Sequence, residues 1–274
     1  MTPSVEVFEM LTNRTLLGMT GLCALLLCLC LPSWAKNGLS RPGTKAGQEA
    51  KGPDGGTYVW VPPGEFDMGA EDIGAAEKPV HHVKITKGFW LGKCTVTNAQ
   101  YQRYCDKTGA MFPGESCLGN KYPVTWVNWA EAKAYCKHYG LALPTEAQWE
   151  YAARGPEGRK YPWGDEWDQG KCCNRENQGP KRMTFPVGSF PAGASWCAAL
   201  DMAGNVWQWC KELCDAKYYA TSPDTDPPGA ASGRLRGLRG GAWLSDGTLC
   251  RSAHRHIIPT SRNFDYGFRA SRTP

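Results

Sequence analysis

The sequence predicts an α+β domain, in which two or three early helices precede a long, loop-rich half with many tryptophans. Residues 58–61 and 65–69 are expected to be extended on either side of a turn at 62–64, and residues 82–85 alternate in the manner of a half-buried strand. Three later segments carry helix signals: 97–104, 129–139 and 145–154. After Gly155, glycine, proline, tryptophan and asparagine punctuate short extended pieces, so few helices are expected there.

Each helical segment has a recognisable start. Thr97-Asn98 caps the first, and Trp129 opens the second, whose apolar residues share one face until Gly140 ends it. Thr145 is the expected cap of the third helix, and Gln148 occupies the position of its capping-box partner. The three helices are therefore predicted from local signals alone.

The first 35 residues have the layout of a secretory signal peptide. Arg14 precedes an apolar run over residues 16–31, which is shorter than the roughly 20 residues that a membrane span needs. Ser33 and Ala35 supply small residues at −3 and −1, so we expect cleavage after Ala35. This predicts a periplasmic or secreted protein with no membrane contact after cleavage. Retention of the segment as an anchor is the alternative.

The remainder divides into two parts by composition. Residues 36–55 are rich in glycine, lysine and other polar residues, and predict a flexible leader. Residues 56–274 predict one folded domain with an ordinary apolar core. The net charge of +5 is spread along the chain without a basic run, so no nucleic-acid partner is expected.

Of the 13 cysteines, ten follow the signal segment. An even number in an exported protein indicates disulfides first. Zinc is the rival interpretation, because Cys210 and Cys214 have a ligand-like spacing. No second close cysteine pair or histidine pair completes such a site in the sequence.

Eight short blocks occur in an order that resembles one family. They are VPPGEFDMG (61–69), TVTNAQY (95–101), YPVTWVNW (122–129), LPTEAQWEYAARG (143–155), YPWG (161–164), DMAGNVWQW (201–209), RGGAW (239–243) and GFR (267–269). Together they resemble the formylglycine-generating enzyme, or sulfatase-modifying-factor, family over nearly all of residues 57–272. The resemblance implies a variant of the C-type-lectin fold that is rich in irregular structure.

The resemblance leaves several functions open, because a fold does not fix an activity. Relatives include the oxidase that converts a sulfatase cysteine to formylglycine, sulfur-transfer enzymes, and periplasmic proteins that mature pyoverdine-type siderophores. They also include the ligand-binding variable proteins of diversity-generating retroelements.

The oxidase of this family holds Cu(I) between two cysteines five residues apart, after a Gly-Gly-Ser-aromatic motif. Counted forward from that motif, the two positions fall on Ser245 and Cys250, and Ala242 replaces the motif serine. Ser245 and Cys250 are thus candidate catalytic residues, but a hydroxyl is a poor Cu(I) ligand, so copper-dependent chemistry is not expected. Counted backward from Arg251, the resemblance makes Cys250 a scaffold residue that pairs with Cys136 in a disulfide.

The resemblance also implies calcium, which prefers several hard oxygen ligands. The ligands would be Asp201, the backbone carbonyls of Gly204 and Val206, and Gln208, which stands where the family usually has glutamate. A second site would use Asn174. The alternative for residues 201–208 is a tight turn before a buried strand.

In the family, the segment after the glycine pair lines the substrate cleft. His254 is the candidate acid or base and Arg255 the candidate ligand for a substrate carboxylate. The other expected cleft residues are Trp243, Arg251, His256 and Tyr266. The alternative is that the arginines form scaffold ion pairs and the histidines lie on the surface.

Two classes of function follow. The first is a periplasmic enzyme that oxidatively matures a peptide or peptide-derived small molecule, such as a siderophore, without copper. The second is a ligand-binding protein diversified by a retroelement, because residues 244–249, 254, 256–258, 260–261 and 263–266 can all arise from asparagine codons by changes at adenines. A purely structural envelope component is a third possibility.

Overall fold

The computed structural model describes residues 38–72, 74–114, 118–178 and 183–274. The predicted signal peptide and its cleavage point lie outside these residues. The helices are α1 (Asn98–Thr108), α2 (Trp129–His138) and α3 (Glu146–Arg154). The strands are β1 (Glu49–Lys51), β2 (Thr57–Val61), β3 (Gly64–Met68), β4 (His81–Ile85), β5 (Phe89–Gly92), β6 (Trp207–Cys214), β7 (Leu235–Arg239), β8 (His256–Pro259), β9 (Tyr266–Gly267) and β10 (Ser271–Arg272). In the described part of the chain, no helix is both long and apolar enough to cross a membrane.

The three predicted helices are confirmed, and each begins with a full capping box. Thr97, Asn128 and Thr145 accept a hydrogen bond from the backbone three residues on, and the side chain there returns one. Helix α1 continues to Thr108, beyond its predicted end at residue 104. The helix ends at Gly109, whose φ of 74° is left-handed. A glycine suits this position because the left-handed conformation strains residues that carry a Cβ.

The strands form three sheets. One has the order β1-β2-β5-β10, the second is the β3-β4 hairpin, and the third has the order β8-β7-β6-β9. All the strand pairs are antiparallel except the pair of β6 with β9, in which Trp207 lies opposite Tyr266. This mixed topology, with all three α-helices before residue 155, confirms the α+β prediction.

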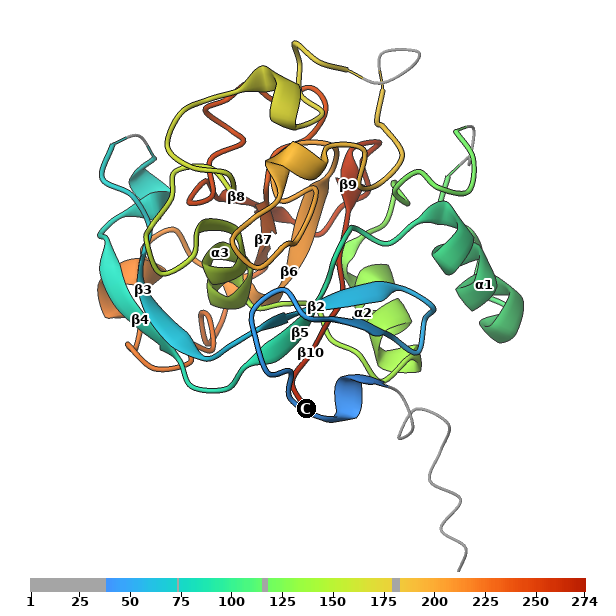
Figure 1. Cartoon of the computed structure of the whole chain (residues 1–274), viewed down its shortest axis with the longest axis horizontal. Coiled ribbons are helices and arrows are strands. Elements are labelled where there is room, and N and C mark those ends of the chain that lie inside the picture. The colour runs from blue at the N-terminus through green and yellow to red at the C-terminus, as the bar shows by residue number, and fades with distance from the viewer. Residues whose placement is uncertain (1–37, 73, 115–117, 179–182) are drawn as a thin grey trace, which may run out of the picture.

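Helix α3 lies in the middle of the molecule, between the β3-β4 hairpin and the sheet that contains β6 and β7 (Figure 1). Two large apolar clusters pack around this frame. One gathers Tyr101, Tyr135 and Trp209, and the other gathers Val61, Phe66 and Trp149. Long loops connect the strands that follow α3.

A buried ion-pair network ties α3 to β7 and to the C-terminal segment. Arg239 is fully buried and donates to Glu146 at 2.9 Å and to Glu150 at 3.0 Å. Glu146 also accepts from Arg255, and Glu150 from Arg154. Burial alone would raise the pKa of Glu146, but Arg255 and Arg239 hold this pKa well below its usual range.

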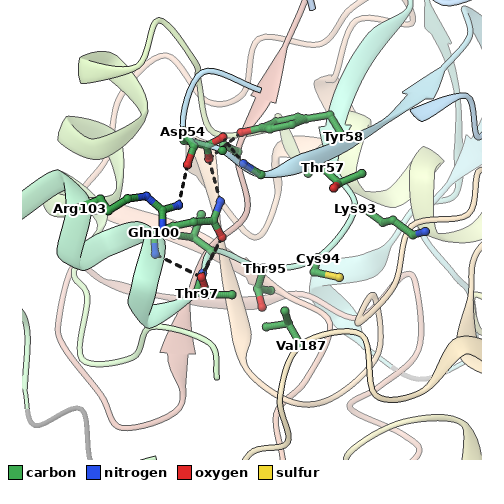
Figure 2. Close-up of a pocket in the computed structure, with 15 residues that line it drawn as sticks. Asp54, Thr57, Tyr58, Lys93, Cys94, Thr95, Thr97, Gln100, Arg103 and Val187 are labelled. Atoms are coloured by element: carbon green, nitrogen blue, oxygen red, sulfur yellow. Dashed lines mark hydrogen bonds between the residues drawn. The ribbon is translucent and has the colours of Figure 1, made fainter. Parts of the chain in front are cut away.

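The prediction of a flexible leader over residues 36–55 is wrong for the described residues 38–55. Leu39 is fully buried in the core, and β1 pairs with β2. Figure 2 shows the Asp54 carboxylate accepting hydrogen bonds from Tyr58 and Gln100, and Tyr135 donates to the same group. Polar composition suggested disorder, but one leucine and one aspartate are enough to fix this segment to the domain.

This correction predicts a measurable loss of stability. Leu39→Ala should lower the free energy of unfolding by about 2–4 kcal/mol, because it leaves a cavity in the core. Lys45→Ala, on an exposed residue of the same segment, should leave the urea midpoint unchanged. Equal urea midpoints for both variants and the parent would contradict this prediction and support a flexible leader.

Candidate functional site

The C-terminal segment turns sharply at two glycines before it reaches the candidate residues. Gly240 and Gly241 have φ values of 93° and 76°. A Cβ on Gly241 would lie 2.9 Å from the Cys250 sulfur, so a larger residue would collide there. The motif glycines therefore allow the chain to fold closely over Cys250.

Ser245 closes the turn that follows. Its side chain is buried, and its hydroxyl oxygen accepts a hydrogen bond from the Ala242 amide at 2.9 Å. The Ser245 carbonyl accepts from the amide of Arg175. These contacts give Ser245 a structural part in the turn, and a catalytic role for it stays a prediction without support from the geometry.

The predicted disulfide between Cys136 and Cys250 is wrong. Cys136 and Cys250 are both free thiols in this structure. Cys250 lies in a small cluster with Cys172, and Cys136 belongs to a different part of the core beside Tyr135. The hydrogen bond between the two thiols lowers the pKa of Cys172, against the effect of burial, and raises the pKa of Cys250. The sulfur that faces Cys250 thus comes from a loop that precedes it by 78 residues.

Arg255 belongs to the scaffold, as the second of the two sequence interpretations proposed. Its guanidinium donates to both carboxylate oxygens of Glu146, at 3.1 and 2.6 Å, and a third bond reaches the Ala76 carbonyl. Only 5% of Arg255 is exposed. With its donors used inside the protein, Arg255 is not placed to bind a substrate carboxylate.

His254 forms a dyad with a carboxylate. Its Nδ1 lies 3.1 Å from Glu77, and Arg251 donates to the same carboxylate at 2.8 and 2.9 Å. Burial alone would raise the pKa of Glu77, but hydrogen bonds from His254 and Arg251 lower this pKa to about 2. A carboxylate can only accept, so Nδ1 carries the proton and Nε2 has its lone pair available. The arrangement orients an imidazole for proton transfer.

His254 and His256 both contact Trp207. The ring centroids lie 5.8 Å apart for His254 and 5.1 Å apart for His256. The Tyr266 hydroxyl is 3.4 Å from His256 Nε2. Burial, and then the neighbouring His254, lower the pKa of His256, so this ring is neutral at neutral pH. His254, His256, Trp207 and Tyr266 form what we call the histidine cluster.

An exposed aromatic surface lies beside the histidine cluster. It comprises Trp126, Trp243, Leu244 and Phe264, and we call it the aromatic patch. The Phe264 ring lies 5.8 Å from Trp243 and 6.3 Å from Trp126. The buried Nε1 of Trp243 has no hydrogen-bond partner among the described residues. Such an apolar surface is suited to a planar ligand that stacks on the exposed rings.

Asp265 connects the aromatic patch to the histidine cluster. It follows Phe264 in the chain, and its carbonyl accepts from the Trp207 amide. The side chain is buried, its Oδ1 has no partner among the described residues, and burial raises the pKa of Asp265 to about 6. This carboxyl is thus able to exchange a proton close to neutral pH.

The raised pKa of Asp265 predicts a pH-dependent loss of stability. The folded protein holds this proton more tightly than the unfolded chain, whose aspartates titrate near 3.9. Stability should therefore fall as the pH rises from about 4 to about 6, and Asp265→Asn should remove this component. Urea midpoints at pH 4.5 and 7 would show it as a gap between parent and variant that widens with pH. A constant gap would contradict the assignment.

The turn around Asp201 does not fit the predicted calcium ligands as a set. The Gln208 amide oxygen already accepts from Trp149 at 2.9 Å and from Arg269 at 2.6 Å. Asn174 uses its oxygen for the amides of Glu176 and Asn177, inside its own turn. The guanidinium of Arg269 also binds the Asp201 carbonyl.

Asp201 itself is buried, which raises its pKa, and it accepts from the Gly188 amide at 2.8 Å. Calcium binding by its carboxylate and the carbonyls of Gly204 and Val206 stays a prediction. Three or more metal-binding side chains do not gather anywhere in the described residues.

Two cavities lie outside the aromatic patch and the histidine cluster. One, of about 320 Å³, lies between Asp54, Cys94 and Thr95 (Figure 2). Burial raises the pKa of Cys94 to about 12, so this thiol is not a ready nucleophile. The other, of about 360 Å³, is lined by Arg251 and Ala253 and carries Arg154, Arg159 and Lys160. It lies next to the His254 dyad, and its lining mixes these basic side chains with the carboxylates of Asp67, Glu71 and Asp72.

Comparisons with known proteins agree with the motif order. The model of the sulfatase-modifying factor enzyme 1-like domain (FGE-sulfatase) matches residues 44–274. The chain is 33% identical to the formylglycine-generating enzyme of Streptomyces coelicolor, over 78% of this chain and 88% of that enzyme. It is 30% identical to the hercynine oxygenase of Mycolicibacterium smegmatis, over 78% of this chain and 59% of that enzyme. The chain therefore belongs to the FGE-sulfatase family.

Solved structures place the chain more narrowly within this fold. PvdO from Pseudomonas aeruginosa superposes with a TM-score of 0.73 at 26% identity, over 85% of this chain and all of that one. Treponema denticola variable protein 1 superposes with a TM-score of 0.69 at 25% identity, over 80% of this chain and 95% of that one. The C-type-lectin-like fold that the sequence predicted is confirmed.

Proposed function

We propose that this chain is an exported oxidative maturation factor for a peptide-derived product such as a siderophore, working without the two-cysteine copper site. The observation that carries the proposal is the His254–Glu77 dyad, held by Arg251 beside an exposed aromatic patch. The likeness of the chain to PvdO and to the hercynine oxygenase supports an oxidative reaction. The absence of a thiol at Ser245 supports a route that does not need Cu(I) between two cysteines.

The proposed reaction is a two-electron oxidation. The planar part of the substrate stacks on Trp243 and Phe264, and Nε2 of His254 removes one proton while Glu77 stabilises the imidazolium that forms. Two electrons and two protons pass from the substrate to dioxygen, which becomes hydrogen peroxide.

A gene deletion tests this function. The deletion strain should accumulate a precursor with two more hydrogens than the finished product, detected by mass spectrometry of the culture. Complementation with the parent gene should restore the product. A deletion strain that makes only the finished product would overturn the proposal. Peptide-synthetase genes beside this gene would be an independent expectation.

Export adds a prediction about the thiols. In an oxidising compartment, Cys172 and Cys250 should form a disulfide through exchange with an oxidised dithiol carrier, which takes both electrons and both protons. Protein purified from the periplasm should resist alkylation at these two residues until it is reduced, as peptide mass spectrometry would show. Cys136, which has no such neighbour, should react in the unfolded protein without reduction. Full alkylation of all three would contradict the prediction.

The likeness to Treponema denticola variable protein 1 favours a second candidate, a ligand-binding protein. Most positions that fit the codon pattern are at least partly exposed, among them Leu244, Thr248, Thr260, Ser261 and Phe264. Ser245, Asp265 and Tyr266 are buried, which limits diversification there. A neighbouring reverse-transcriptase gene with an adenine-rich template repeat would support this candidate, and a neighbourhood without either would rule against it.

A further inference from the structure

A third cavity, away from the C-terminal segment, has the composition of a ligand site. It has a volume of about 580 Å³, within the usual range for small-molecule pockets. Helix α2, the turn after it, the far part of β6 and strand β7 supply its walls. Its floor is aliphatic, formed by Leu141, Leu143, Leu213 and Ala230.

The polar lining of this cavity is positive. Lys133 and Lys137 come from α2, Lys211 from β6 and Arg236 from β7. Within the described residues, no carboxylate lies within 4.0 Å of the charged nitrogens of these four side chains. Arg236 stacks on Trp129, with the guanidinium carbon 3.6 Å from the ring centroid, and this contact fixes its direction.

The one acid in the lining is Glu212, and it is neutral at neutral pH. Burial, and then the charge of Glu146, raise the pKa of Glu212 to about 8. Its Oε1 accepts from the Glu146 amide at 2.7 Å, but its buried Oε2 has no partner among the described residues. A protonated carboxyl adds no negative charge to the lining, so the four cations are not offset from within the cavity wall.

We propose that this cavity binds a small amphipathic anion, namely a carboxylate on an aliphatic chain. The chain would cover the leucine floor, and the carboxylate would meet the lysines and Arg236. Four cations without acidic partners around an apolar floor are complementary to this chemistry and repel a cationic ligand of the same shape. The site is separate from the one that carries the proposed oxidation.

Calorimetric titration of the purified chain with decanoate tests the proposal. Decanoate should bind with a stoichiometry of one, and decyltrimethylammonium, which has the same chain and the opposite charge, should not bind. The double variant Lys137→Glu/Lys211→Glu should weaken decanoate binding at least tenfold. Both lysines are exposed, so the fold should be retained, as an unchanged thermal midpoint would confirm.

Two further variants make the location testable. Ala142→Trp places a large side chain from an exposed wall position into the cavity and should abolish decanoate binding. Lys45→Glu changes the net charge by the same amount as one cavity variant, outside the cavity, and should bind as the parent does. Equal binding of the cationic probe, or binding that survives both Ala142→Trp and the double variant, would overturn the proposal.

Discussion

Arg239→Met should lower the free energy of unfolding by about 3–5 kcal/mol, the usual cost of removing one partner from a buried ion pair. The Arg239 side chain is fully buried and donates to Glu146, Glu150 and the Tyr219 hydroxyl. Its removal leaves two carboxylates inside the protein with one cation fewer. Urea denaturation should show a midpoint lower by about 1–2 M.

Arg262→Met is the matched control for this prediction. Arg262 also pairs with a glutamate, Glu131, but its side chain is 54% exposed. Water and salt screen such a pair, so the urea midpoint should stay where it is in the parent. A similar loss in both variants would show that burial does not decide the importance of these ion pairs. Arg239 also binds the carbonyls of Ser252 and His254, so its loss should disturb the candidate site.

His254→Asn should slow product formation by at least 100-fold, because a positioned general base usually contributes 10²–10⁴ to a rate. Glu77→Gln should slow it as well, since the amide no longer fixes the imidazole tautomer or stabilises the imidazolium. The KM should change little, because neither group is assigned to substrate binding. Rates measured on precursor from the deletion strain would show both effects.

His82→Asn is the control for a histidine beside a carboxylate. His82 lies 3.2 Å from Asp67, on the exposed face of the β3-β4 hairpin, and among the described residues it has no contact with the histidine cluster. It should retain the parent rate. If His254→Asn matched this control, the dyad would be structural, and the proton acceptor would have to be sought at Asp265.

Much of the fold follows from local chemistry in the sequence. The capping boxes at Thr97 and Thr145 involve residues three apart, so they are visible without any tertiary information. The pairing of β6 with β9 joins Trp207 to Tyr266 and has no such local signal, which is why the strand order of the sheets could not be predicted. The leader was misjudged because the contacts of Leu39 and Asp54 are made with residues far along the chain.

The candidate site was predictable only in part, for the same reason. The resemblance placed His254, Trp243 and Tyr266 in the segment that forms the candidate site. No local sequence pattern indicates that Glu77 is the partner of His254. The two lie 177 positions apart. Counting residues likewise assigned Cys250 to Cys136, when the neighbouring thiol is Cys172. Phe264 was seen only as a variable position, because exposure is a property of the folded chain.

The central claim is that this chain oxidises a peptide-derived precursor. The most direct test is to incubate the purified protein with the precursor that the deletion strain accumulates, in air and under argon. In air, the precursor should lose two hydrogens and one dioxygen should be consumed for each product, with hydrogen peroxide formed in equal amount. Under argon the precursor should remain intact. A precursor that binds but leaves unchanged in air would contradict the account and favour a binding protein.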